Sequence, residues 1–490
     1  MIRPFGLPAS ALVVARSPHF ILSLILLLTF LVYAPVLDDW FGGDDFFYLR
    51  AAQLKSPLEF LTESFDFRDT TEPADSTGGQ YRPLYVFTIV AEGELFGSHA
   101  LPYHLVNLLI HVANAALVWL IARKVTQRPL IAHIAALVFS VHPTYSSVVG
   151  SISELSALAA TLGALVCLWA FMKALDGGAQ RKLWYLISVT SYLAAMLYHP
   201  KAAPVLVALV AYYFLIHPGN PNRRLSPRAW LRFAPYVGIV LFPLFVGLLV
   251  RSEFTDVQRN FGYGPHVYKN YLHFLVMGVV PYPFLASDRL LGAATPTFTA
   301  GIIAFFAWIG MGGWPLRDGC TRAAHLFALL WLLTAILPLT LSIWGAPPRQ
   351  FYIAGPAFAI VLSLFFVNLL DSLSKVRFSR VVLASVLLVC LVLASQWMFT
   401  TQQDRGRHAA QSQDFIEELR QTYPTLPADA ALYVVDAPFS LRVFDNVYLV
   451  KAISLYYGDI RVEPVSQTRA QELELSPQPN ERVFRYSGYD

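Results

Sequence analysis

The sequence predicts an all-α polytopic membrane protein with about eleven transmembrane helices and a small α/β domain at its C-terminal end. Of the 490 residues, 56% are apolar and only 14% are charged, whereas soluble chains carry roughly 25% charged residues. The charge is also unevenly spread, because long blocks such as His19–Leu37 and Val381–Phe399 have no Asp, Glu, Lys or Arg. This composition excludes a soluble enzyme and a disordered chain. The three cysteines offer no disulfide framework.

The predicted transmembrane helices follow from segment length, since crossing about 30 Å of hydrocarbon takes about 20 predominantly apolar residues. Eleven segments reach or approach this length: 19–37, 103–122, 130–149, 154–174, 183–199, 200–217, 233–250, 297–315, 323–343, 351–370 and 380–399. The fifth and sixth are separated at His199 and Pro200, where proline favours a turn. The apolar stretch Tyr268–Leu285 contains Pro281 and Pro283, so we expect it at the membrane interface.

The positions of lysine and arginine predict an orientation with the N-terminus inside and the C-terminus outside. In this orientation the basic residues of the short loops are cytoplasmic: Arg123, Lys124, Arg128, Lys173, Arg181, Lys182, Arg223, Arg224, Arg228, Arg232, Arg317, Arg322, Lys375, Arg377 and Arg380. The opposite loop His142–Glu154 has none, and the first long loop, Asp38–Ala100, holds twelve acidic and four basic residues. The net charge of +4 is therefore explained by basic residues that set the orientation in the membrane, and we expect no nucleic-acid partner.

Two domains are expected. A transmembrane domain spans 1–399 and includes the first exported loop, 38–102; a small exported domain spans 400–490. Within the second, Ser412–Thr422 has a helical pattern, and Ala431–Asp436 and Arg442–Val450 have the pattern of strands. The polar stretch rich in proline and glutamine after Ser466 is expected to be mobile.

Two adjacent carboxylates, Asp44 and Asp45, are the first candidates for chemistry. They follow Gly42 and Gly43 and precede an aromatic run in the string WFGGDDFFYLR. Carboxylates between an aromatic wall and a membrane surface would be partly desolvated, as suits a general base or a cation site. The alternative is a solvated cap on a helix that begins near Phe46.

A polar stripe in the second predicted span is the next candidate. His104, Asn107, His111 and Asn114 fall on one helical face. Polar groups inside a bilayer must face protein or water. Interhelical hydrogen bonding explains such a stripe without any site.

Several ionisable residues lie at the predicted exported ends of other spans: His142, Glu154, His199, Lys201 and Arg349. Exported cations run against the usual charge distribution, so either an anionic ligand or snorkelling to lipid headgroups must explain Lys201 and Arg349. Arginine presents a fork that suits phosphate oxygens. The sequence has no P-loop, no GxGxxG after a strand and no HExxH.

Four strings resemble the polytopic GT-C glycosyltransferases, most of all the transmembrane tetratricopeptide-repeat O-mannosyltransferases and their bacterial relatives. They are YRPLYVFTIVAEGELFGSHALPYHLVNLLIHVANAALVWLIARKV from Tyr81, FSVHPTYSSVVGSISE from Phe139, YLHFLVMGVVPYP from Tyr271 and RQFYIAGPAFA from Arg349. The resemblance covers most of residues 35–370. The chain departs from these relatives because no repeats follow, and because Ser147 and Ala157 stand where they usually carry acids.

The resemblance implies an inverting transferase that uses a sugar linked to polyprenyl phosphate. An acidic residue of the first exported loop, here Asp44 or Asp45, would activate the acceptor. Arg349, helped by Lys201, would bind the donor phosphate. The remaining candidates for the substrate groove are Tyr81, Arg82, His104, His142, Glu154 and His199.

The sequence therefore predicts a multi-pass glycosyltransferase of the bacterial inner membrane. Its acceptor would be a lipid, a glycan or a protein at the exported face. Relatives differ in metal use, so a divalent ion is left open, with Asp44, Asp45 and Glu154 as its candidate ligands. Two alternatives stand beside this reading. One is a transporter or flippase of lipid-linked sugars, and the other is a catalytically degenerate scaffold subunit of an envelope glycan assembly.

Overall fold

The structure is a computed structural model that describes most of the chain. The described residues are 17–54, 56, 58–59, 62, 82–218, 226–249, 262–279, 319–343, 345, 347–373, 379–442, 446–476 and 478–488. They are mostly helical, with one small sheet. The predicted span 297–315 lies outside the described residues.

The elements alternate long helices with short 3₁₀ or π turns, labelled η. As far as Asp176 they are α2 (Pro18–Tyr33), η1 (Ala34–Asp38), α3 (Asp45–Leu54), α6 (Pro83–Phe96), α7 (Ala100–Thr126), α8 (Pro129–Ser140), η2 (Pro143–Tyr145), α9 (Ser146–Gly150), η3 (Ile152–Glu154) and α10 (Leu155–Asp176). As far as Leu373 they are α11 (Arg181–Tyr198), η4 (Pro200–Ala202), α12 (Val205–Ala211), η5 (Tyr212–Ile216), α14 (Pro227–Leu231), α15 (Ala234–Leu249), α17 (Pro265–Val279), α19 (Gly319–Ile336), η7 (Leu337–Leu341), η8 (Pro348–Ala354) and α20 (Gly355–Leu373).

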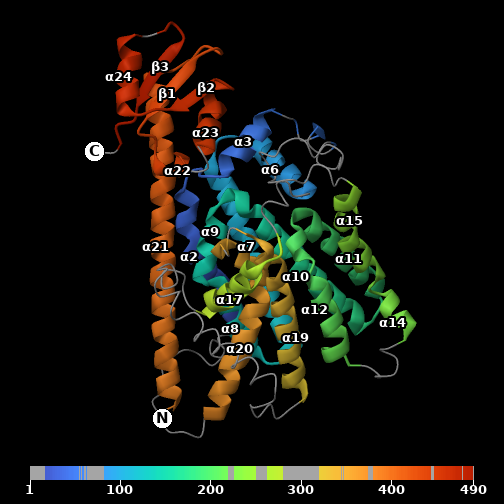
Figure 1. Ribbon diagram of the computed structural model, residues 1–490. Coiled ribbons are helices and arrows are strands. Elements are labelled where there is room, and N and C mark those ends of the chain that lie inside the picture. The colour runs from blue at the N-terminus through green and yellow to red at the C-terminus, as the bar shows by residue number, and fades with distance from the viewer. Residues whose placement is uncertain are drawn as a thin grey trace. The chain divides into compact units, whose positions relative to one another are not determined.

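The rest of the chain begins with the longest helix, α21 (Ser379–Thr422), and ends in a small domain. This domain contains β1 (Ala431–Val435), α22 (Phe439–Arg442), α23 (Val447–Tyr457), β2 (Arg461–Pro464), α24 (Gln467–Leu475) and β3 (Glu481–Arg485). Its three strands are parallel in the order β2-β1-β3, with α24 against the sheet (Figure 1).

The protein is an integral membrane protein with several spans. Among the described helices, five segments are long and apolar enough to cross a membrane: Pro18–Asp38, Ala100–Thr126, Ile152–Asp176, Thr321–Leu341 and Pro348–Asp371. Each coincides with a segment predicted from hydropathy, so those five predictions are confirmed as helices of sufficient length.

Proline sets two of the breaks between helices. α11 ends at Tyr198, and His199 has the extended backbone that a following proline imposes, which confirms the predicted turn. The predicted span 130–149 is wrong as one helix. It ends at Ser140, because His142 precedes Pro143 and is extended, so α8 is followed by η2 and α9.

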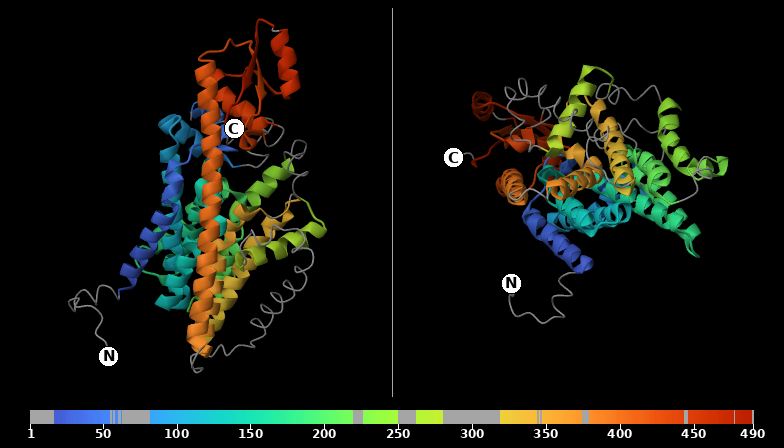
Figure 2. Two further views of the ribbon diagram at one scale, coloured as in Figure 1. Left: turned by 90° about the vertical axis from the view of Figure 1, so that its left-hand side faces the viewer. Right: turned by 90° about the horizontal axis from the view of Figure 1, so that it is seen from below.

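Helix α21 is longer than the predicted span 380–399. It runs on for 44 residues in total (Figure 2), because the polar residues after Phe399 include many good helix formers and no proline. It ends just before Tyr423-Pro424, where proline disfavours helix in the preceding residue.

The α/β character of the tail is confirmed, but two details of the prediction are wrong. The predicted strand Arg442–Val450 is replaced by the end of α22 and the start of α23, whose buried residues Leu449, Ala452 and Ile453 recur with helical spacing. The stretch after Ser466 forms α24 and β3. The Ser466 hydroxyl accepts from the Arg469 backbone N–H and caps α24, and β3 pairs with β1.

The chain groups into two compact units by its contacts. The first unit comprises Met1–Ala34, Leu108–Val148 and Ser156–Phe399. The second comprises Pro35–Asn107, Val149–Leu155 and Thr400–Asp490. In the first unit α8 packs against both α2 and α20, and α20 also packs against α19. Gly355 begins α20 where a Cβ atom would lie 1.9 Å from the Tyr145 hydroxyl, so this close approach requires glycine.

Candidate active site

Among the described residues of the second unit, Asp45 is the most buried carboxylate, with 3% of its surface exposed. Its Oδ1 accepts from the Ser153 backbone N–H at 2.8 Å, and its Oδ2 accepts from the Gly42 backbone N–H at 3.1 Å. Burial raises the pKa of Asp45 to about 7, although both backbone bonds favour the charged form. Both oxygens are therefore engaged in holding the segment around Gly42 to the segment around Ser153.

Asp44 lies one residue earlier and is half-buried. Its Oδ1 accepts a hydrogen bond from the Tyr448 hydroxyl at 2.5 Å. Gly43 precedes it with φ of +57°, a conformation that strains other residues. The glycine thus lets the chain turn between Gly42 and α3, so that adjacent carboxylates have different surroundings. Asp44 is the more accessible of the two.

Aromatic side chains of α3 and α6 stand beside these carboxylates. The rings of Tyr48 and Tyr85 are 5.1 Å apart, and the Arg82 guanidinium carbon lies 5.0 Å from the Tyr85 ring centroid. The Tyr85 hydroxyl donates to the Ser153 carbonyl at 2.7 Å. Arg82, Asp44 and Glu154 all act electrostatically on Tyr48. We call Asp44, Asp45, Arg82 and Glu154 the charged cluster.

The 149–155 segment, which carries Glu154, is held from two further directions. The Asn107 amide donates to the Ser151 carbonyl at 2.9 Å. The Arg405 guanidinium occupies the space above Gly150, where a Cβ atom would lie 1.4 Å from Arg405 Nη1. Arg405 also pairs with Asp39 at 2.7 Å, and burial raises the pKa of Asp39 while Arg405 opposes this shift. The segment is thus fixed by contacts with α7 and α21.

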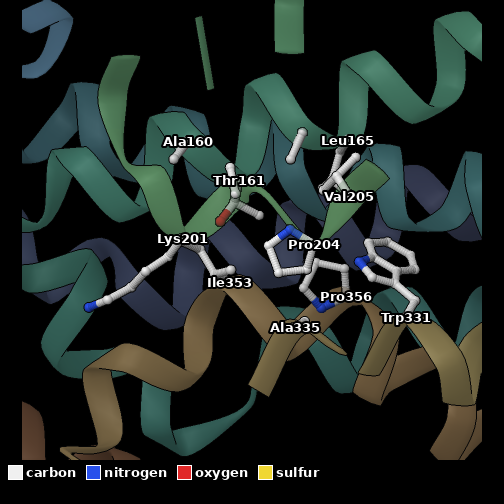
Figure 3. Close-up of a pocket in the computed structure, with 12 residues that line it drawn as sticks. Ala160, Thr161, Leu165, Lys201, Pro204, Val205, Trp331, Ala335, Ile353 and Pro356 are labelled. Carbon is white, nitrogen blue, oxygen red and sulfur yellow. The ribbon is translucent and has the colours of Figure 1, made fainter. Parts of the chain in front are cut away.

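In the first unit, Lys201 lines a small open hollow. The walls are mainly apolar and come from α10, η4, α12, α19, η8 and α20. Figure 3 shows the Lys201 side chain extended away from Trp331 and Pro356, with the Thr161 hydroxyl near the centre. An ammonium beside an apolar hollow suits an amphipathic anion.

Arg349 belongs to the first unit as well. It is exposed on η8, the turn that contributes Ile353 to the wall of the hollow. Pro348 begins η8, where its fixed φ favours the first turn. The sequence places Lys201 and Arg349 148 positions apart, whereas the fold brings η4 and η8 to the same hollow.

Two of the predicted histidines, His142 and His199, have structural roles. His142 Nε2 lies 3.1 Å from the Gly278 carbonyl, and its Nδ1 contacts the Thr144 hydroxyl. The His199 side chain accepts from the Lys201 backbone N–H at 3.3 Å and so caps η4. His104 is fully buried in α7.

The other members of the polar stripe form hydrogen bonds between helices. His111 Nδ1 lies 2.8 Å from the Tyr352 hydroxyl, and the Asn114 amide donates to the same hydroxyl at 3.1 Å. These bonds favour the structural explanation of the stripe over a site. They connect α7 with η8.

Tyr81 lies outside the described residues. In the part of the chain that the structure describes, no three His, Cys, Asp or Glu side chains form a group able to hold a metal ion. Both oxygens of Asp45 already accept backbone N–H groups, and one oxygen of Asp44 accepts from Tyr448. The described residues therefore show no metal site, and a divalent ion held by Asp44, Asp45 and Glu154 stays a prediction.

Sequence reasoning missed Tyr448, Arg405 and the residues that share the hollow with Lys201. Tyr448 and Asp44 are 404 positions apart, and no local pattern links them. Gly150 is the one local sign of the Arg405 contact, since a glycine can mark a place where another group packs closely. The sequence does not say which group that is.

Comparisons with known proteins agree with this architecture. Residues 81–246 match the family model described as dolichyl-phosphate-mannose-protein mannosyltransferase. ArnT from Cupriavidus metallidurans, solved with undecaprenyl phosphate bound, superposes with a TM-score of 0.53 at 14% sequence identity, over 97% of this chain and 90% of that one. This chain has the GT-C fold of membrane glycosyltransferases.

A second solved structure shares the GT-C fold. It is the archaeal oligosaccharyltransferase AglB from Archaeoglobus fulgidus, in complex with an inhibitory peptide and a dolichol-phosphate. The TM-score is 0.50 at 14% identity, and the match covers 90% of this chain but only 64% of AglB. No curated protein matches the sequence. The resemblance to GT-C proteins noted in the sequence is confirmed, and the matched family region contains Arg82, Glu154 and Lys201.

Proposed function

We propose that this protein transfers a sugar from a polyprenyl-phosphate-linked donor to an acceptor hydroxyl at the exported, periplasmic face of a bacterial inner membrane. The observation that carries the proposal is the unequal pair at the start of α3: a buried Asp45 that is fully engaged, beside a more accessible Asp44. The GT-C fold and the polyprenyl phosphates bound by ArnT and AglB support the class of donor.

Asp44 acts as the general base in the proposed reaction. Its carboxylate takes the proton of the acceptor hydroxyl while the acceptor oxygen attacks the anomeric carbon of the donor. The bond between that carbon and the phosphate oxygen breaks on the opposite face, so the sugar is transferred with inversion. Polyprenyl phosphate leaves with the bonding electron pair, and the proton stays on Asp44 until solvent removes it.

Lys201 and Arg349 would stabilise the phosphate of the donor. A cation matters most as the bond to the leaving group breaks, because negative charge then builds up on the phosphate. The apolar wall beside Lys201 suits the first part of a prenyl chain, while the ammonium suits the phosphate. Asp45 has no chemical step and holds the loop that presents Asp44.

Release of polyprenyl phosphate tests the proposed activity. Purified protein in lipid nanodiscs would be incubated with a panel of undecaprenyl-phosphate-linked sugars and a membrane extract as the acceptor source. We expect at least one sugar to be transferred, with equimolar release of undecaprenyl phosphate. In a parallel assay the protein is reconstituted in sealed vesicles; movement of intact donor across their bilayer without release would support the flippase alternative. Inertness toward every donor in both assays would support the scaffold.

Lys201→Ala should weaken binding of undecaprenyl phosphate by roughly 10–100-fold, because a hydrogen bond to a charged group contributes about 1.5–3 kcal/mol. Binding would be measured with the lipid in nanodiscs by scintillation proximity. Lys201→Arg should retain most of the affinity, since it keeps the charge. Lys182→Ala is the matched control, because Lys182 is exposed in α11 and does not line the hollow. Equal affinity in Lys201→Ala and Lys182→Ala would contradict the phosphate role.

A further inference from the structure

Helix α23 of the C-terminal domain packs along helix α3, which begins with the buried Asp45. The two helices are linked at both ends. At the far end of α3, the Gln53 amide donates to the Leu455 carbonyl at 3.1 Å, and Arg50 pairs with Asp459 at 3.0 Å. These contacts lie within the second unit, and they place α23 beside the helix that begins at the charged cluster.

Tyr448 makes the contact at the near end. Its side chain is 7% exposed, and its ring meets the Phe47 ring edge-on at 5.8 Å between centroids. Lys451, one turn later, places its ammonium 5.7 Å from the centroid of Phe47 on the same side of α3. The ring position is thus fixed by packing, and the hydroxyl reaches Asp44 Oδ1 at 2.5 Å.

We propose that Tyr448 is a positioning residue for the catalytic base Asp44, so that the C-terminal domain forms part of the transfer machinery. This inference rests on the proposed function, because it assumes that Asp44 is the base. A phenol that donates to one carboxylate oxygen fixes the plane of the carboxylate. The direction of the second oxygen, which would accept the proton of the acceptor, is then fixed as well.

The packing explains why a tyrosine suits this place. Phenylalanine would keep the contact with Phe47 and lose only the donor to Asp44. An aromatic side chain has two rotatable bonds, so its hydroxyl can be held at low entropic cost.

Tyr448→Phe in the full-length protein is the first test. We expect kcat to fall about tenfold or more, since the lost bond involves a charged group, while KM for the undecaprenyl-phosphate-linked sugar stays unchanged. The matched control is Tyr457→Phe. It removes another hydroxyl of α23, which donates to the Tyr423 carbonyl at 2.6 Å inside the C-terminal domain. Wild-type kcat in Tyr448→Phe, or an equal loss in both variants, would overturn the proposal.

An infrared measurement gives a second test that needs no substrate. The phenol C–O stretch of Tyr448 is the band that Tyr448→Phe removes from the spectrum of the purified protein. We expect this band to shift in Asp44→Asn, because the neutral amide oxygen is a weaker acceptor than the carboxylate, while the band assigned through Tyr457→Phe stays in place. An unshifted Tyr448 band would overturn the contact.

The outcomes separate this inference from the proposed function. If Asp44→Asn is inactive and Tyr448→Phe is normal, the base stands and the role of Tyr448 fails. If Asp44→Asn transfers sugar at the wild-type rate, the proposed base fails and the role of Tyr448 falls with it, whatever the infrared bands show. Loss of kcat in Tyr448→Phe together with the shifted band supports both.

Discussion

Asp44→Asn is expected to lower the rate of sugar transfer by about 10²–10⁴-fold, the usual contribution of a positioned general base. The amide has nearly the same shape as the carboxylate but cannot take the proton of the acceptor. The Tyr448 hydroxyl can still donate to the amide oxygen, so we expect the fold to remain intact. The measurement is release of undecaprenyl phosphate from the donor that the wild-type protein accepts.

Two comparisons sharpen this result. Asp38→Asn removes the same charge from the same loop, but Asp38 is exposed, so this variant should keep wild-type activity. Binding of undecaprenyl phosphate alone should be equal in Asp44→Asn and the wild type, because Asp44 has no part in holding the phosphate. Transfer at the wild-type rate by Asp44→Asn would remove the base from the mechanism.

The apolar helices were the part of the fold that sequence could predict well. A membrane span depends on the composition of one continuous segment, so Ala100–Thr126 and Pro348–Asp371 follow from hydropathy alone. The break at His199 and Pro200 is local too, because proline acts on its immediate neighbours. The early end of α8 has the same cause, because Pro143 acts on His142. The span 130–149 was predicted from its hydropathy alone, without weight given to this proline.

The C-terminal domain was harder because its pattern is ambiguous. Val447, Tyr448 and Val450 favour a strand by residue type, yet α23 is helical since its apolar face packs against α3. Tertiary packing decided between two local preferences. The same reason explains β3, whose polar sequence becomes a strand by pairing with β1.

In the candidate site, too, local features could be predicted from the sequence and contacts with distant residues could not. Asp44 and Asp45 could be selected from sequence, because adjacent acids after two glycines are a local feature. Their difference in burial could not, since it arises from Ser153 and Tyr448, which lie far along the chain. His142 and His199 were selected for their chemistry, and their hydrogen bonds now give them structural roles.

Asp45→Ala is expected to destabilise the second unit by about 2–6 kcal/mol, since it leaves the Gly42 and Ser153 N–H groups without their acceptor and each such loss costs about 1–3 kcal/mol. Asp45→Asn should lose less, because its one oxygen still accepts one N–H. Hydrogen exchange of the Gly42 and Ser153 amides reports this directly. Asp38→Asn serves again as the control, and unchanged protection of both amides in Asp45→Ala would contradict the role of Asp45.

The stability of the second unit should also fall as the pH rises from about 4 to about 7. Burial raises the pKa of Asp45 from 3.8 to about 7, so in this range the folded protein holds a proton that the unfolded chain releases. The free energy of unfolding then decreases with pH, by about 4 kcal/mol over the whole range at 1.36 kcal/mol per unit. Below pH 4 both states are protonated, so the free energy of unfolding is at its highest and no longer changes with the titration of Asp45.

Asp45→Asn isolates this effect, because the amide does not titrate. The measurement is the difference in thermal midpoint between the wild type and Asp45→Asn at a series of pH values, which cancels every other titrating group. We expect the wild type to lose stability relative to Asp45→Asn as the pH increases to about 7, and the difference then to become constant. A wild type that gains on the variant over this range would mean that the two backbone N–H groups outweigh desolvation, so that Asp45 is held as a carboxylate at all working pH values.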